Sequence, residues 1–315
     1  MKIALDAMGG DFAPHAAVAG ALLAARELAG KAQIVLIGSP EAVPPLLAEH
    51  GPDAEALLEF VPASQVIDMG EHPAKAFQQK QDSSIAVGYR LLHGGAVEAF
   101  CSAGNTGAML VGAMFTVKAV PGVLRPAIAN FVPKLSGGFG ILLDVGANAD
   151  CKPEMLEQFG ELGSLYAKYV LGIDTPKVGL MSLGEEEGKG TAVTQAAHQL
   201  LKINPHLHFV GNIEGRDLFN DKADVLVCDG FVGNVMLKMA ESIYEIMADK
   251  QLQIDPFFAK FNYEAIGGSP ILGINDNAII GHGVSTPLAI CNMLLQGYQM
   301  AHSGIADQIK NTFKS

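Results

Sequence analysis

The sequence has 315 residues, of which 49% are hydrophobic, and a formal net charge of −12. This composition is typical of a fully folded globular protein, and the acidic balance argues against nucleic acid as a partner. No apolar run approaches the ~20 residues of a membrane span, and the apolar start is broken at Asp6, which argues against a secretory signal. Four cysteines lie in or beside apolar stretches without metal-type spacing, which predicts buried thiols in a reducing cytoplasm: Cys101, Cys151, Cys228 and Cys291.

Strand patterns alternate with helical patterns along the whole chain, which predicts an α/β protein with a mostly parallel sheet and helices on both faces. We expect strands at residues 3–5, 34–37, 96–101, 127–132, 139–143, 178–181 and 225–227. We expect helices at residues 16–28, 73–92, 106–118 and 287–312, the second of them stopped by Gly94-Gly95. No linker rich in proline or serine divides the chain. Residues 1–315 are therefore expected to form a single α/β unit of two intertwined lobes that share one sheet.

Five of the predicted strands run directly into a polar loop that contains glycine. In an open α/β sheet, ligands bind beyond the carboxyl ends of the strands. Glycine at such a position lets backbone N–H groups approach an anion. The five loops therefore predict one glycine-walled cleft for a small anion, as in an enzyme. They span residues 6–11, 102–107, 144–148, 184–190 and 229–234.

The loop Ser102-Ala-Gly-Asn-Thr-Gly107 joins a strand to a helix and is the best candidate for a phosphate site. A helix start carries free N–H groups and roughly +0.5 of a charge, which suits phosphate. A tight turn capped by Thr106 is the structural alternative, but it explains less readily why three polar residues occur together. The loop is neither a Walker loop nor a Gly-x-Gly-x-x-Gly motif. With the turn at Gly9-Gly10, the predicted phosphate-binding residues are Gly9, Gly10, Ser102, Gly104, Asn105, Thr106 and Gly107.

Aspartates stand at three of these strand ends. Paired carboxylates could hold Mg²⁺, and Asp11 could instead cap the first helix. A carboxylate beside phosphate must be offset by cations or amides, so we assign these side chains supporting roles in which they orient neighbouring donors. The residues concerned are Asp6, Asp11, Asp144 and Asp229.

The loop Gly184-Glu-Glu-Glu-Gly-Lys-Gly190 places three acids and one lysine between glycines. It is either a solvated surface loop or a gating loop whose Lys189 neutralises developing negative charge, followed by a helix that Thr191 caps. The asparagines after two strands can both donate and accept hydrogen bonds near a carbonyl or phosphate. The histidine of Gly-His-Gly could assist a leaving group, although a structural role is the commoner one for a histidine. The predicted catalytic residues are Lys189, Asn148, Asn234 and His282.

Taken in order, these motifs resemble those of the bacterial phosphate acyltransferases of phospholipid synthesis. The resemblance covers nearly the whole chain and rests on residues 3–11, 82–85, 102–107, 142–148, 184–190, 211–217 and 229–235. It implies a three-layer α/β/α, Rossmann-like architecture similar to phosphotransacetylases and isopropylmalate-type dehydrogenases. It also implies that an acyl group passes from acyl carrier protein to inorganic phosphate, and that a membrane acyltransferase then transfers it to glycerol 3-phosphate. A cytoplasmic homodimer with at most peripheral membrane contact is implied as well, without a metal or nicotinamide cofactor.

The chain departs from this family in one region. Residues 236–274 form a shorter helical excursion than is usual, and the family's Tyr-Gly-Gly is Ile266-Gly-Gly268 here. We expect the excursion to make dimer or transient membrane contacts, with an ordinary core face as the alternative. The apolar residues behind this expectation are Met236, Met239, Ile243, Met247, Phe257, Phe258 and Phe261.

An acidic carrier protein needs a basic landing site, for which we select Lys118, Arg125 and Lys134. Three other functions remain open. The first is a phosphotransacetylase that uses an acyl-coenzyme A donor. The second is a dehydrogenase dependent on metal and NAD, which the scarcity of clustered arginines argues against. The third is a non-catalytic scaffold that recruits acyl carrier protein.

Overall fold

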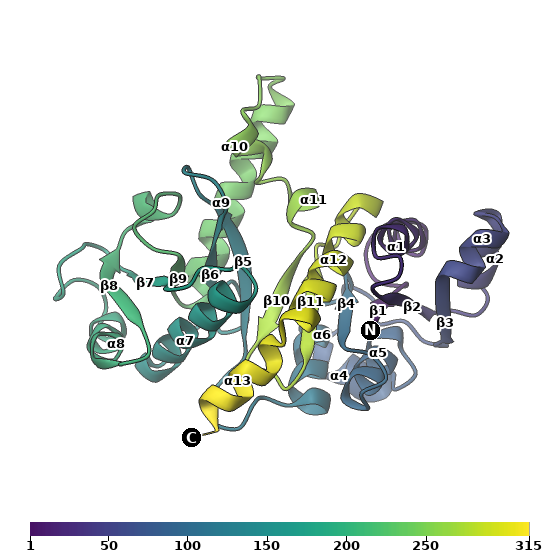
Figure 1. The fold of residues 1–315 in the computed structure, drawn as a ribbon, viewed down its shortest axis with the longest axis horizontal. Coiled ribbons are helices and arrows are strands. Elements are labelled where there is room, and N and C mark those ends of the chain that lie inside the picture. Colours follow the sequence, from purple (N-terminus) through teal and green to yellow (C-terminus); the bar gives the residue numbers. More distant parts are fainter. Residues whose placement is uncertain (315) are drawn as a thin grey trace. The chain divides into compact units, whose positions relative to one another are not determined.

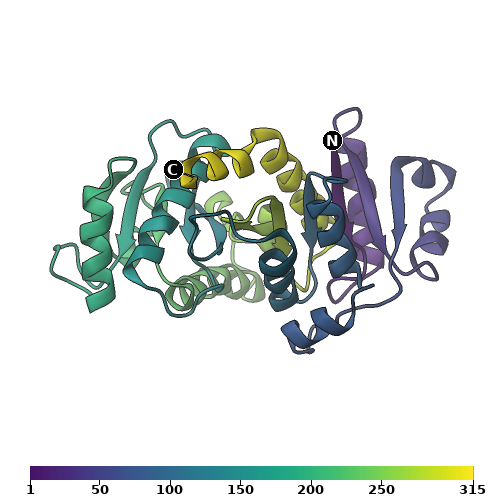
Figure 2. The ribbon, with the colours of Figure 1, turned by 90° about the horizontal axis from the view of Figure 1, so that it is seen from below.

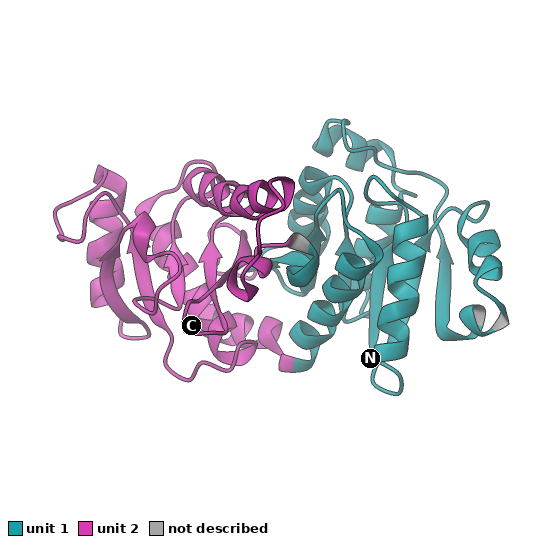
Figure 3. Cartoon of the chain, turned by 90° about the horizontal axis from the view of Figure 1, so that it is seen from above, with its two compact units in different colours: residues 1–119, 263–302 teal, residues 120–262, 303–315 magenta. Residues whose placement is uncertain are grey.

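The computed structural model describes residues 1–314, and the chain separates into two compact units (Figures 1 and 3). Unit 1 comprises Met1–Ala119 and Tyr263–His302, and unit 2 comprises Val120–Asn262 and Ser303–Ser315. Each unit is thus built from two separate stretches of chain. That the two units share one sheet stays a prediction.

The sheet of unit 1 has the strand order β3-β2-β1-β4-β11-β10. Every neighbouring pair is parallel except β10 and β11, and β1, β2 and β3 lie side by side at the purple and blue end of Figure 2. The core is apolar on both faces of these strands, with Ile3, Leu5, Ile34 and Leu36 fully buried. The strands are β1 (Lys2–Asp6), β2 (Gln33–Gly38), β3 (Leu58–Pro62), β4 (Ala99–Ser102), β10 (Gly268–Leu272) and β11 (Asn277–Gly281).

Helices flank this sheet, and several begin where a proline or a capping side chain stands. Ser83, for example, accepts a hydrogen bond from the N–H of Ala86 at the start of α5. The helices are α1 (His15–Glu27), α2 (Val43–Glu49), α3 (Pro52–Leu57), α4 (Pro73–Gln79), α5 (Ser84–His93), α6 (Thr106–Gly112), α11 (Tyr263–Ile266) and α12 (Pro287–Ser303). A π-helical segment, Ala113–Val117, continues α6 directly.

Two long helices predicted from the sequence are each broken in the structure. Residues 73–92 form two helices, because α4 ends at Gln79 and Ser83 caps the start of α5. Residues 287–312 form α12 and α13, because Gly304 between them takes a left-handed φ of 67°. The predicted stop at Gly94-Gly95 is confirmed, with Gly94 at the C-cap of α5. Asp11 is not a helix cap, since α1 begins after Pro14.

The sheet of unit 2 has the strand order β5-β6-β9-β7-β8, with β5 antiparallel to β6 and the remaining pairs parallel. Helices α7 and α8 pack against each other beside it (Figure 2). The strands are β5 (Ala127–Pro133), β6 (Phe139–Leu143), β7 (Lys177–Met181), β8 (His208–Ile213) and β9 (Val225–Val227). The helices are α7 (Pro153–Tyr169), α8 (Ala192–Ile203), α9 (Gly230–Asp249), α10 (Pro256–Ala259) and α13 (Ile305–Phe313), with a short 3₁₀ turn at Gly215–Asp217.

The segment 236–274 contains most of α9 and all of α10 and α11, but it also contains strand β10, so the predicted helical excursion does not extend to residue 274. The ring of Phe219 contacts the rings of Phe257 and Phe261 at centroid distances of 5.9 and 5.1 Å, and Phe261 is buried. These rings therefore pack within unit 2, whereas Met239 on α9 is 69% exposed. None of the helices in residues 1–314 has the length and apolar character that crossing a membrane requires.

Candidate active site

The loops after β1 and β4 are tied together in unit 1, because these strands are parallel neighbours. The hydroxyl of Ser102 donates to the carboxyl of Asp6 at 2.7 Å and accepts from the N–H of Gly104 at 3.0 Å. Gly9 lies against this pair so closely that a Cβ atom there would stand 2.6 Å from both Asp6 Oδ2 and Gly104 N. Only glycine fits, so the two turns approach each other backbone to backbone.

Asp6 is the buried centre of this arrangement. Burial raises the pKa of its carboxyl, while hydrogen bonds from Ser84, Ser102 and the N–H of Met8 act in the opposite direction. The side chain faces its own turn and the serine. The geometry therefore agrees with a carboxyl that holds donors in place.

A third loop of unit 1, which follows β11, joins these two. The N–H of Asp11 donates to the carbonyl of Gly283 at 2.7 Å, and Gly10 has a φ of 101° and faces the same carbonyl. His282 lies directly after β11 and is exposed. Its carbonyl accepts hydrogen bonds from both the N–H and the hydroxyl of Ser285. The structure thus places His282 one residue from the contact with the predicted phosphate turn.

Asn105 is the N-cap of α6, so the structural alternative of a Thr106 cap is wrong. Its Oδ1 accepts from the N–H of Ala108, and its Nδ2 donates to the carbonyls of residues 68, 69 and 71 at 3.0 to 3.2 Å. The side chain of Asn105 therefore fastens that turn to the start of α6. The N–H groups of Thr106 and Gly107 belong to the first helical turn, where no helical acceptor exists. They are therefore the candidate donors of this loop for an anion.

In unit 2, the loops after β6 and β9 meet around the buried carboxyl of Asp144. It accepts hydrogen bonds from the N–H groups of residues 128, 146, 147 and 148 and from the side chain of Asn148. Burial raises the pKa of Asp144, and these hydrogen bonds oppose the rise. On the β9 side, Asp229 caps α9 by accepting from Val232 N at 2.8 Å, and Gly230 N donates to the carbonyl of Asn148.

The two asparagines predicted to face developing charge differ in the hydrogen bonds that their side-chain amides already make. Both hydrogens of the Asn148 amide are used, one on the carbonyl of Pro126 and one on Asp144, each at 2.9 Å. Asn234 is exposed, and its amide makes one long contact of 3.5 Å with the carbonyl of Val145. A donor for a substrate oxygen is therefore available at Asn234, while Asn148 holds the loop.

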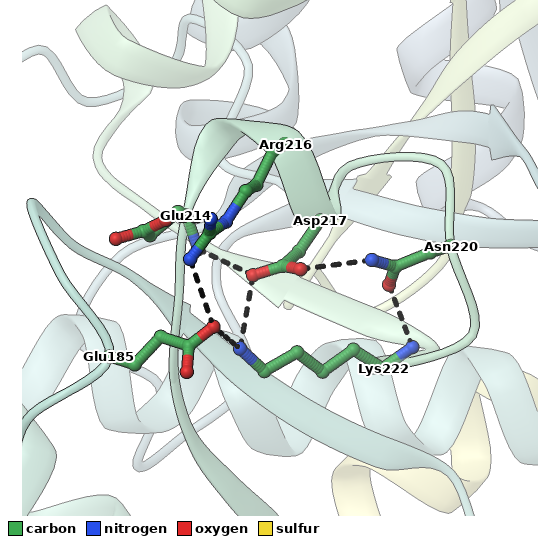
Figure 4. A network of polar contacts seen from close by, with 6 residues as sticks. All are labelled: Glu185, Glu214, Arg216, Asp217, Asn220 and Lys222. Carbon is green, nitrogen blue, oxygen red and sulfur yellow. Dashed lines mark hydrogen bonds and ion pairs between the residues drawn. The ribbon is translucent and has the colours of Figure 1, made fainter.

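Lys189 lies in the loop between β7 and α8, and Thr191 caps α8 as predicted. The side chain of Lys189 is exposed, and its carbonyl accepts from the hydroxyl of Ser182 at 3.2 Å. Of the three glutamates before it, Glu187 is bound by Lys202 of α8. Glu185 is bound by Lys222, which also pairs with Asp217 (Figure 4). Sequence reasoning assigned no role to these partners, although Asp217 closes the motif Gly211-Asn-Ile-Glu-Gly-Arg-Asp217.

One residue of the predicted landing site is not available. Lys134 is buried and forms an ion pair with Asp224, which itself is buried. Lys118 in unit 1 and Arg125 in unit 2 are exposed. The cysteines follow the prediction at three positions, since Cys101, Cys228 and Cys291 are buried, but Cys151 is partly exposed.

Comparison with known proteins decides the family. Residues 1–308 match a family described as "Fatty acid synthesis protein". A phosphate acyltransferase of Salinibacter ruber is 42% identical over 100% of this chain and 98% of its own length. One from Heliobacterium modesticaldum is 45% identical over 93% of this chain and 92% of its own length. The chain belongs to the phosphate acyltransferase family. The predicted enzyme class, a transferase of acyl groups, and its role in lipid synthesis are thereby confirmed.

Solved structures of similar fold confirm the predicted architecture. A phosphotransacetylase from Streptococcus pyogenes superposes with a TM-score of 0.67 at 17% identity, covering 96% of this chain and 94% of that one. A branched-chain phosphotransacylase from Enterococcus faecalis gives 0.64 at 15% identity, covering 96% and 99%. This phosphate acyltransferase family member therefore has the mostly parallel α/β fold with flanking helices that its strand and helix pattern predicts.

Proposed function

We propose that the protein transfers a fatty acyl group from an acyl carrier protein thioester to inorganic phosphate and releases an acyl phosphate. The observation that carries the proposal is the turn pair of unit 1, in which Ser102 links Asp6 to Gly104 and Gly9 leaves no room for a side chain. The N–H groups of Gly9 and Gly104 are already bound, by the carboxyl of Asp6 and the hydroxyl of Ser102, and thereby fix the two turns. The first turn of α6 adds backbone N–H groups that have no helical acceptor, and inorganic phosphate fits such donors.

The reaction needs no strong base. Phosphate is already an anionic nucleophile, and a thiol leaves readily because its pKa is near 8.5. The enzyme has to hold phosphate in line with the thioester carbonyl and stabilise the charge that develops on the carbonyl oxygen. We assign phosphate binding to residues 9–10 and 102–107 and charge stabilisation to Lys189 and Asn234. His282 is the candidate that assists the departing thiol.

The supporting residues follow from the hydrogen bonds. Asp6 and Asp144 each hold a turn by accepting several donors, and Asp229 fixes the start of α9. Asn148 and Asn105 fasten loops with their side chains. These residues act through the backbone they position.

The wider setting is part of the same proposal. We infer a cytoplasmic homodimer whose acyl phosphate is used by a membrane acyltransferase to acylate glycerol 3-phosphate. Exposed apolar side chains on α9, among them Val235, Met239 and Ile246, support a contact of this helix with a second copy or a membrane surface. Lys118 and Arg125 remain the candidate landing residues for the acidic carrier protein.

The decisive experiment measures phosphate-dependent release of free thiol from purified acyl carrier protein that bears a long acyl chain. Metal and NAD are omitted, and an acyl-coenzyme A donor is assayed in parallel. We expect thiol release and acyl phosphate formation with the carrier protein donor. Release with coenzyme A alone would replace the proposal by a phosphotransacetylase. Binding of the carrier protein without turnover would point to a scaffold, and dependence on metal and NAD to a dehydrogenase.

A further inference from the structure

The loop that carries Lys189 is held at three consecutive residues, each by a different neighbour in unit 2. The carboxylate of Glu185 is bound from the connection between β8 and β9, where Lys222 lies 2.8 Å away. The carbonyl of Glu186 accepts from Asn212 at 2.9 Å. The carboxylate of Glu187 is bound from α8. The backbone is therefore fixed just before Lys189.

Further contacts hold the ammonium of Lys222 in place beside Glu185 (Figure 4). The ammonium also contacts Asp217 at 3.1 Å, and Asp217 is buried and accepts from Glu214 N and from the side chain of Asn220. The guanidinium of Arg216 lies 3.4 Å from the same oxygen of Glu185. The hydrogen bond from Lys222 and its charge hold the pKa of Glu185 below its usual range, so this glutamate stays ionised and paired.

The other side of the loop has a matching arrangement on α8. Lys202 lies 2.8 Å and Gln199 2.6 Å from the carboxylate of Glu187. Nδ1 of the buried His198 donates at 2.8 Å to Oδ1 of Asn212, the residue that holds the carbonyl of Glu186. Hydrogen bonds from Lys202 and Gln199 lower the pKa of Glu187.

These pairings matter because the loop contains three glutamates and one lysine. Without other partners, the glutamates of such a loop would pair with its lysine, since opposite charges a few residues apart attract each other. Instead, the two glutamates that flank the centre are bound by cations from outside the loop. Within residues 1–314, no hydrogen bond or ion pair engages the ammonium of Lys189, which is exposed.

We propose that Lys222 and Lys202 are positioning residues that keep Glu185 and Glu187 from neutralising Lys189. The ammonium of Lys189 is thereby left unpaired within its own loop and can contact the substrate. The inference rests on the proposed function, in which Lys189 faces the charge that develops during acyl transfer. This inference gives the glutamates at residues 185–187 a role that they would not have in a plain surface loop.

The test is a rescue experiment on kcat for phosphate-dependent thiol release. Lys222→Met leaves Glu185 with only its longer contact to Arg216, and we expect kcat to fall by up to about fivefold, the effect of one unit charge at ~4 Å in water. Glu185→Gln alone should stay within about twofold of the wild type, and Lys222→Met/Glu185→Gln should return to that level. The pair Lys202→Met and Glu187→Gln repeats the design on α8. Lys310→Met, which breaks an exposed pair with Asp307 on α13, is the control for loss of one positive charge.

The outcomes separate the inference from the function on which it rests. If Lys222→Met/Glu185→Gln is as slow as Lys222→Met, Lys222 acts only as an anchor through Asp217, and the inference is wrong. Loss of activity in Glu185→Gln alone would contradict it in the same way. Rescue in both pairs, with Lys310→Met at the wild-type rate, supports it. A wild-type protein that forms no acyl phosphate would instead overturn the proposed function.

Discussion

The hydroxyl of Ser102 donates a 2.7 Å hydrogen bond to the buried carboxyl of Asp6, from which it is separated by 96 positions in the sequence. This bond joins the turns that follow β1 and β4. Because Ser102 also accepts from Gly104 N, one serine sets the distance between the two turns. The geometry of the predicted phosphate site therefore depends on a carboxyl that does not itself face an anion.

Asp6→Asn should change how stability depends on pH. Burial raises the pKa of Asp6 above its usual value of 3.8, so the folded protein keeps this proton at pH values where the unfolded chain has lost it. The stability contributed by Asp6 is fully present below the unfolded pKa and is lost as the pH rises through the folded pKa. The asparagine has no such proton. In thermal unfolding from pH 3.5 upward, the Tm of the wild type minus that of the variant should therefore fall as the pH rises. A constant difference would contradict the pKa assignment.

Gly9→Ala should weaken catalysis without unfolding the protein. The added Cβ would stand 2.6 Å from Gly104 N and from Asp6 Oδ2, so the two turns must separate. Misplacement of a bound group by about 1 Å can cost about 10²-fold in rate, and we expect a loss of that order in kcat/KM for phosphate. Gly70→Ala is the matched control, because nothing lies within 4 Å of its Cβ. Equal activity of the two variants would remove the Gly9 turn from the phosphate site.

We expect Asn148 to be a structural residue and Asn234 to be a catalytic one. Asn148→Ala leaves the carbonyl of Pro126 without its donor and should cost about 1–3 kcal/mol of stability. Asn234→Ala should keep the Tm and lose about 10²–10³ in kcat, the usual effect of removing an oxyanion donor. Thermal unfolding and steady-state kinetics on both variants check this. The reverse pattern would exchange their roles.

Sequence patterns predict the strand ends well but not the partners across them. Apolar runs followed by glycine locate the loops after β1, β4, β6, β7 and β9 within a residue or two. The Asp6–Ser102 bond depends on β1 and β4 being neighbours, which is a property of topology and not of either local sequence. Asn105 shows the same limit, since its residue type indicates hydrogen bonding but not that the turn at residues 68–71 supplies the acceptors.

Both helix breaks carry a local signal that a single long helix does not explain. Residues 78–84 are all polar and contain the Ser83 cap, and Gly304 separates α12 from α13. Lys134 shows that a charged residue type does not by itself predict an exposed side chain. Its partner Asp224 lies 90 residues away in the sequence, and the two form a buried ion pair.

Phe261→Ala should destabilise the protein rather than weaken a membrane contact. Phe261 is buried against Phe219 and Phe257, and removing a buried phenylalanine typically costs about 3–5 kcal/mol. Met239→Ala on α9, where the side chain is 69% exposed, should leave the Tm nearly unchanged. Vesicle flotation of both variants completes the test. Lost flotation in Phe261→Ala with an unchanged Tm would assign the phenylalanines to a membrane surface after all.

Lys189→Ala should reduce kcat by about 10²–10³ while the Tm stays at the wild-type value. The reason is that Lys189 is exposed and its ammonium is bound to no other group of residues 1–314, so its removal costs no folding energy but takes away the cation that we propose faces developing negative charge. Lys189→Arg keeps the charge on a different shape and should recover part of the rate. Lys310→Ala, which removes a partly exposed lysine of the same unit, is the control. Near-normal turnover of Lys189→Ala would remove this lysine from the mechanism, and with it the purpose of holding Glu185 and Glu187 away from it.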